Sequence, residues 1–160
     1  MTVREVLRHP HPLLTRVAEP AEPEAAARVA ADLLDTMRSF PRCVGVAAPQ
    51  IGELVRVAVV DCSLHPKATE HHGELVLVNP VIVARSGGEV GREGCLSIPE
   101  LTANVRRATA VTVEAAGGLR VDAVGFEARA LQHEIDHLDG LLFLDRVESL
   151  ESDVFERRRR

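Results

Sequence analysis

His133-Glu134-Ile135-Asp136-His137 is an HExxH motif, and the chain around it decides the fold. On an α-helix, side chains at positions i and i+4 lie one above the other on the same face. His133 and His137 can therefore direct two imidazole nitrogens at one metal ion, with Glu134 beside them to handle a proton. Catalytic sites of this kind usually have three protein ligands and keep one position open for water. The motif predicts a metal site whose third ligand lies elsewhere in the chain.

The residues around the motif have the pattern of a helix. Apolar residues recur at helical spacing over residues 126–138, and Gly140 is well placed to end the helix. Leu131 and Ile135 flank the histidines, so the face that carries them is expected to be partly buried. Buried histidines need polar partners. The alternative is an ordinary solvated face, because short motifs also occur by chance.

The rest of the chain predicts one further helix and several strands. Residues 24–40 have apolar side chains at helical spacing, and Pro23 suits the first turn of that helix. A polar, histidine-bearing loop is expected over residues 61–73, and Gly117-Gly118 predicts a hairpin turn. The fold class is therefore α+β: largely antiparallel sheets packed around a central helix that carries HExxH, with an N-terminal helix. The strands are expected at residues 55–60, 75–78, 81–84, 105–115 and 119–124.

Length and composition predict how the chain is organised. The chain has 160 residues, 46% of them apolar, with four Phe and no Trp or Tyr, so the core is expected to be aliphatic. Domains commonly contain about 100–150 residues, and residues 1–150 are expected to form a single domain. Residues 151–160 are expected to be a charged, disordered tail. The run Arg157–Arg160 at its end leaves open a contact with RNA or another acidic surface.

Charge and cysteine content limit the expected partners and location. A formal net charge of −5 gives no reason to expect DNA binding. No apolar stretch is long enough to span a membrane, and the N-terminus does not resemble a secretion signal. Cys43, Cys62 and Cys95 are too few, and odd in number, for a disulfide framework, which favours a reducing compartment. The expected location is the cytoplasm.

Three positions in the sequence are where related metal sites could have their third ligand. The extended pattern HExxHxxGxxH is followed as far as Gly140, but its last position is Phe143, which cannot bind a metal. Glu156 lies at about the distance that thermolysin-like sites use, yet it falls in the charged tail. Cys95 is the better candidate, because a thiolate binds the softer divalent ions well. The alternative for Cys95 is a buried structural thiol.

Three segments together resemble a known family. Residues 45–50 (GVAAPQ), 93–97 (EGCLS) and 132–137 (QHEIDH) are similar to the signature segments of peptide deformylases, in the same order and with similar spacing. The resemblance covers nearly the whole chain. It implies that residues 1–150 are a catalytic domain, and that the protein is a metal-dependent hydrolase. Such an enzyme removes the N-terminal formyl group from the formyl-methionine of newly synthesised polypeptides and releases formate.

The resemblance also implies a catalytic arrangement. Cys95, His133 and His137 would hold one divalent ion, Fe²⁺ in the cell, with Zn²⁺, Ni²⁺ or Co²⁺ possible in purified protein. Glu134 would act as the general base and later return the proton to the leaving amine. The remaining catalytic residues implied by the resemblance are Gln50 and the backbone N–H of Leu96, which would form an oxyanion hole, and Gly45. Taken without the resemblance, Gln50 could equally be an amide that caps loop backbone.

The substrate is expected to bind along the same segments. Gly45 would let the substrate backbone pass close to the protein, and Val44 and Val46 would shape an apolar pocket for the methionine side chain. Glu93 also matches a family position, where it would pair with a cation or order the loop. The expected partners are N-formylmethionyl nascent peptides and, transiently, the ribosome.

Two positions depart from the family pattern. Cys43 stands where the family usually has a glycine, which would strain the backbone if that position required positive φ. Thr102 stands where some relatives have an arginine that holds the substrate backbone, and Arg106 or Arg107 is a candidate replacement. These departures leave open a catalytically silent relative that binds peptide or ribosome. A separate possibility is a short zinc protease, which would cleave internal peptide bonds.

Overall fold

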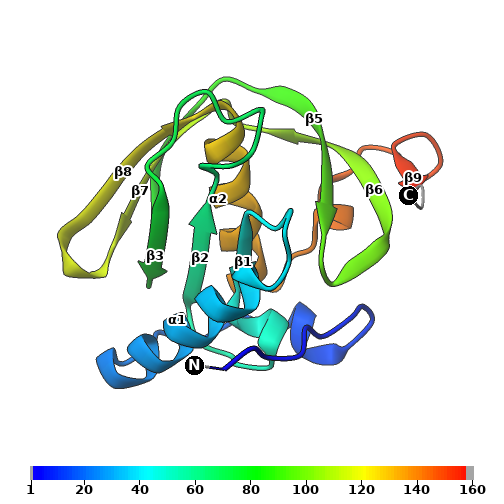
Figure 1. Cartoon of the computed structure of the whole chain (residues 1–160). Coiled ribbons are helices and arrows are strands. Elements are labelled where there is room, and N and C mark those ends of the chain that lie inside the picture. The colour runs from blue at the N-terminus through cyan, green and yellow to red at the C-terminus, as the bar shows by residue number, and fades with distance from the viewer. Residues whose placement is uncertain (1, 158–160) are drawn as a thin grey trace.

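Helix α2 (Gly125–Leu138), which carries the HExxH motif, lies in the middle of the molecule with strands on both sides (Figure 1). We describe residues 2–157 of the chain from a computed structural model. Three antiparallel sheets surround α2, and helix α1 (Pro23–Arg38) lies outside them. This arrangement confirms the predicted α+β class.

Each sheet has three strands in the described part of the chain. The first has the order β1-β2-β3, the second β4-β7-β8 and the third β5-β6-β9, and every pairing is antiparallel. The bounds of the strands are β1 Gly45–Ala47, β2 Val57–Asp61, β3 Glu74–Val78, β4 Val81–Ser86, β5 Glu89–Cys95, β6 Ile98–Arg107, β7 Ala110–Ala115, β8 Leu119–Val124 and β9 Val154–Glu156.

The two helices belong to different parts of the core. Val29, Leu33 and Met37 of α1 are buried against β1 and β2, as the helical spacing predicts. Leu131 and Ile135 of α2 are buried in a second cluster, formed with strands β2, β3, β7 and β8. Both faces of α2 are covered, so the polar residues of the HExxH motif are buried as well. Buried polar groups require partners inside the protein, and these define the site.

The middle of the chain differs from the prediction. The strand expected over residues 105–115 is two strands, because β6 ends at Arg107 and β7 begins at Ala110, in another sheet. Strand β5 was not predicted, since Glu89–Cys95 consists largely of Gly and charged residues without apolar alternation. The hairpin at Gly117-Gly118 is confirmed, joining β7 to β8.

The C-terminal segment also differs from the prediction. Residues 151–160 were expected to be disordered, but Val154–Glu156 forms strand β9 and pairs with Leu101–Ala103 of β6. The disorder prediction is therefore wrong for this strand, because the partner that orders it lies some fifty residues upstream. Arg158–Arg160 lie outside the described residues. Within the described residues we find no helix that is both long and apolar enough to cross a bilayer.

Candidate active site

The three predicted metal ligands meet at one point in the interior. Cys95 lies at the end of β5, where the pairing with β6 shifts register, and the two histidines lie one turn apart on α2. One potential ligand atom from each of Cys95, His133 and His137 lies within 4.8 Å of the others. The Cys95 Sγ is 3.4 Å from the His137 Nε2, and all three residues are buried. A thiolate and two imidazoles form a donor set suited to a divalent transition-metal ion.

The surroundings of the histidines favour a cation. His133 directs its Nδ1 at the Glu93 Oε1, 2.9 Å away, which leaves the Nε2 for a ligand. Burial alone would lower the pKa of His133, but the neighbouring Cys95, Glu134 and Glu93 raise it well above its ordinary value. The pKa of His137 is lowered, by burial first and by the charge of His133 second. The same negative groups that raise the pKa of His133 would stabilise a metal cation.

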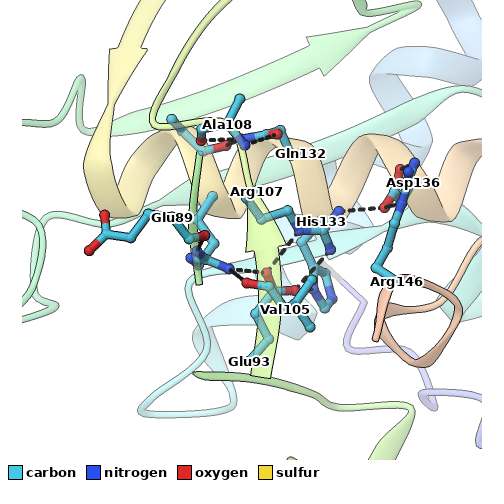
Figure 2. Close-up of polar contacts among 11 residues, drawn as sticks. Glu89, Glu93, Val105, Arg107, Ala108, Gln132, His133, Asp136 and Arg146 are labelled. Carbon is cyan, nitrogen blue, oxygen red and sulfur yellow. Dashed lines mark hydrogen bonds and ion pairs between the residues drawn. The ribbon is translucent and has the colours of Figure 1, made fainter. Parts of the chain in front are cut away.

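Glu93 is the centre of a buried charge network (Figure 2). Arg107 donates two hydrogen bonds to it, at 2.8 and 2.9 Å, and Arg129 donates a third at 2.7 Å. A third nitrogen of Arg107 lies 2.5 Å from Asp136, which also accepts from Arg146. Burial would raise the pKa of Glu93, but the bonds from Arg107 and His133 hold it far below its usual range. Glu93 is therefore ionised.

This network joins the parts of the chain that supply the ligands. It joins β5 to β6 through Glu93 and Arg107, and β6 to α2 through Arg107 and Asp136. Arg146 adds the short helix Phe143–Arg146 that follows α2. Groups that hydrogen-bond a ligating histidine fix the orientation and tautomer of its ring. The expectation that Glu93 pairs with a cation agrees with these contacts, whereas sequence reasoning missed Arg129, Asp136 and Arg146.

Gln132, the first residue of the third signature segment, makes hydrogen bonds to backbone groups and not to the metal ligands. Its side-chain oxygen accepts from the Ala108 N–H at 3.1 Å, and its Nε2 donates to the Ala108 carbonyl at 2.9 Å (Figure 2). A third bond links it to the carbonyl of Ala128 within α2. Gln132 thus connects α2 to the chain between β6 and β7.

Glu134 lies beside the ligands in a cramped position. A methyl group in place of the Gly45 hydrogen would come within 2.8 Å of the Glu134 Oε2, so any side chain at position 45 would force the Glu134 carboxylate to move. The Glu134 Oε1 is buried and has no hydrogen-bond partner in the described part of the chain. Burial raises the pKa of Glu134 to about 7, although His133 partly opposes the shift. A carboxyl group with this pKa can both accept and donate a proton near neutral pH.

Gln50 faces the ligands from a short 3-10 helix, Ala48–Ile51. Its side-chain oxygen accepts from the Ala47 N–H at 3.0 Å. Its Nε2 donates to the Ser97 Oγ at 3.0 Å and lies 3.5 Å from the Cys95 Sγ. Both interpretations of Gln50 therefore agree with the geometry: it caps loop backbone with one end and faces the site with the other. Ser97, which orients the amide, was missed although it lies in the second signature segment.

A cavity of about 530 Å³ opens above these residues. Its wall includes Val44 and Gly45, which were expected to contact the substrate, and Leu96, whose N–H was expected in the oxyanion hole. Val46 is not in the wall, and this prediction is wrong. Side chains alternate along a strand, so β1 turns Gly45 toward Glu134 and Val46 the other way, into the core against α1.

Comparison with known proteins identifies the family. The family model described as polypeptide deformylase matches residues 3–153. The chain belongs to the polypeptide deformylase family. A peptide deformylase from Thermomicrobium roseum is 45% identical, over 92% of this chain and 88% of the relative.

Solved deformylases also share the fold. A crystal structure from Legionella pneumophila has a TM-score of 0.82 and 38% identity, covering 94% of this chain and 89% of that chain. A second structure, from Acinetobacter baumannii with Met-Ala-Ser bound, has a TM-score of 0.80 and 34% identity, covering 91% of this chain and 100% of that chain.

The structure accommodates Cys43, but neither candidate arginine replaces the one that is absent at Thr102. Cys43 does not adopt a positive φ, and its thiol donates to the Gly45 carbonyl at 3.1 Å, so it introduces no backbone strain. Neither candidate replacement for an arginine at Thr102 lines the cavity. Arg107 is committed to the buried network, and Arg106 lines a different cavity and faces Glu148 at 3.8 Å.

Proposed function

We propose that the protein is a peptide deformylase, a metal-dependent hydrolase that acts on newly synthesised polypeptides. It removes the formyl group from the N-terminal formyl-methionine and releases formate and a free amine. The observation that carries this conclusion is the buried triangle of Cys95, His133 and His137 beneath an open cavity. We assign the catalytic domain to residues 1–150, and strand β9 adds to it by pairing with β6.

The proposed ligands are the Cys95 thiolate and one nitrogen each of His133 and His137. Fe²⁺ is the ion we propose in the cell, and Zn²⁺, Ni²⁺ or Co²⁺ also suit this donor set in purified protein. Two contacts support the assignment: Glu93 accepts from the Nδ1 of His133 and so orients the ring of a ligand, and the unpartnered Glu134 Oε1 beside the ligands is free to accept from a water molecule. When bound, such an ion would lower the pKa of a water molecule to about 7 and so supply a nucleophile at neutral pH.

Glu134 is the proposed proton carrier. It accepts the proton of the attacking water, holds it, and delivers it to the methionine nitrogen as the C–N bond of the formyl amide breaks. A pKa of about 7 suits both halves of this transfer. Gly45 is proposed as a catalytic-site residue because its missing side chain leaves room for this carboxylate and for the passing substrate backbone.

Two donors are proposed for the oxyanion that forms on the formyl oxygen: the Nε2 of Gln50 and the backbone N–H of Leu96. Ser97 holds the Gln50 amide in place through its hydroxyl oxygen, at 3.0 Å. Preorganised donors of this kind stabilise negative charge as it develops, and the loss of one typically lowers turnover by about 10²–10³-fold. Val44 is the proposed apolar contact for the methionine side chain. Glu93 lies in one of the segments expected to bind substrate, and its proposed role there is to orient His133.

The proposed substrate also indicates where the protein acts and what it meets there. Formylated chains appear as they leave the ribosome, so we propose that the protein acts in the cytoplasm and contacts ribosomes transiently.

The direct test measures formate release from formyl-Met-Ala-Ser by protein loaded anaerobically with Fe²⁺ or, for stability in air, with Ni²⁺. Glu134→Gln should lower turnover by about 10²–10⁴-fold, because proton transfer is lost, while metal content stays at the wild-type level. Glu148→Gln, on the surface, is the matched control and should remain active. No formate from metal-loaded wild type, or full activity in Glu134→Gln, would contradict the proposal.

A further inference from the structure

The mouth of the active-site cavity is positively charged, although the whole chain has a formal net charge of −5. Four exposed basic residues line it, and we refer to Arg42, Lys67, Arg92 and Arg157 together as the cationic mouth. The carboxylates that line the same cavity, Glu93 and Glu134, are both buried, and Glu93 is neutralised by its arginine partners.

The charges of the cationic mouth are not neutralised by carboxylates in the described part of the chain. Among residues 2–157, no carboxylate lies within 4.0 Å of a side-chain nitrogen of these four residues. Arg129, which lines the same cavity, shows the contrast, because it is paired with Glu93 at 2.7 Å. Cations without acidic partners at a cleft with low-dielectric walls attract anionic ligands.

Arg92 is fixed by neutral groups. Its Nε donates to the Asn104 Oδ1 at 3.1 Å and its Nη1 to the Thr102 Oγ1 at 3.3 Å. The guanidinium also lies over the ring of Phe155, 4.0 Å from its centroid. These contacts restrict the side chain without cancelling its charge, so less conformational entropy is lost when it binds an anion.

Arg157 reaches the mouth because β9 pairs with β6. Its backbone N–H donates to the Glu100 carbonyl at 2.8 Å, which continues the pairing just beyond β9. The guanidinium then lies against Gly94, the residue before Cys95, where an added Cβ would collide with it. The segment 154–157 therefore supplies both Arg157 and the ring under Arg92.

We propose that the cationic mouth selects formyl-methionyl peptides that carry negative charge at the residues following methionine, with Arg92 and Arg157 as the specificity-determining residues. This inference rests on the proposed function. Because the formyl group must reach the buried ligands, the methionine enters first and the following residues lie at the mouth. Acidic side chains there meet cations that have no other acidic partner.

The test compares kcat/KM for three peptides, formyl-Met-Ala-Xaa-Ser-amide with Asp, Asn or Lys as Xaa, using Ni²⁺-loaded protein. The amide removes the terminal carboxylate, so only the third residue changes charge. We expect the Asp peptide to exceed the Lys peptide by about 3–10-fold at low salt, the range for one or two exposed ion pairs. The difference should appear mainly in KM and should shrink in about 0.5 M NaCl, which screens exposed charges.

Two double variants that remove the same charge at different places distinguish an effect of the cationic mouth from an effect of the protein's net charge. The double variant Arg92→Gln/Arg157→Gln should reduce the Asp-to-Lys ratio to below about 2-fold, since both proposed ion pairs are lost. Arg85→Gln/Arg106→Gln removes the same charge from exposed arginines that line a different cavity, and should leave the ratio unchanged. Equal kcat/KM for the Asp and Lys peptides in wild type would overturn the inference. The inference would also be overturned if the Asp-to-Lys ratio stayed at its wild-type value in Arg92→Gln/Arg157→Gln, or if both double variants lost it equally. No formate from any of the three peptides would instead refute the proposed function, and this inference with it.

Discussion

Replacing Arg107 by methionine should destabilise the fold and weaken metal binding together. Arg107 makes three charged contacts in the interior, two with Glu93 at 2.8 and 2.9 Å and one with Asp136 at 2.5 Å. Removing one partner of a buried ion pair typically costs about 3–5 kcal/mol, because a charge is left uncompensated. Here each carboxylate keeps a second arginine, Arg129 or Arg146, so we expect the lower end, about 3 kcal/mol.

The assay is thermal and urea unfolding of the metal-free protein, which removes the contribution of metal binding. For a chain of this size, a loss of about 3 kcal/mol corresponds to a fall in Tm of about 6–12 °C. Metal affinity should also fall about 10–100-fold, because the Glu93 carboxylate that orients His133 is then held by Arg129 alone.

The control is Arg106→Met, one residue away. Arg106 is exposed and its nearest carboxylate, on Glu148, is 3.8 Å away, so its replacement should change stability by less than about 0.5 kcal/mol. Equal losses in the two variants, or a loss below about 1 kcal/mol for Arg107→Met, would refute the reasoning, because the buried network would then contribute no more than a surface pair.

Three further predictions concern the site and the cysteines. Gly45→Ala should lower kcat by about 10²-fold with metal content unchanged, because the new methyl group displaces the Glu134 carboxylate, which lies 2.8 Å from it; wild-type formate release would contradict this. Cys43 and Cys62 should resist iodoacetamide at pH 8, as judged by mass spectrometry, because burial raises the pKa of each thiol to about 12 and leaves almost no thiolate. Their alkylation as fast as in urea-unfolded protein would exclude this burial. Adding Ni²⁺ at about 1,000 times its Kd should stabilise the metal-free protein by about 4 kcal/mol, because only the folded chain brings the three ligands together; an unchanged Tm would show that no such site forms.

The sequence by itself determined the features that depend on local spacing. The helical pattern of residues 126–138 places His133 and His137 one turn apart, and this relation holds in any context that keeps the helix. Gly140, with φ of 74°, ends that segment as predicted. The Gly117-Gly118 hairpin and helix α1 also follow from local residue patterns.

Other features depend on which distant segments meet, and only the tertiary structure decided these. Charged residues such as Glu93 of β5 and Arg107 are typical of solvent-exposed chain when the sequence is considered alone. These two are buried in the structure because the groups that neutralise their charges lie on other strands and on α2. Val46 points away from the cavity because β1 is oriented by its contact with Glu134. Strand β9 is ordered by pairing with β6, and this pairing brings Arg157 to the mouth of the site. A local pattern fixes backbone geometry over a few residues, whereas burial and charge pairing are set by neighbours that the fold alone brings together.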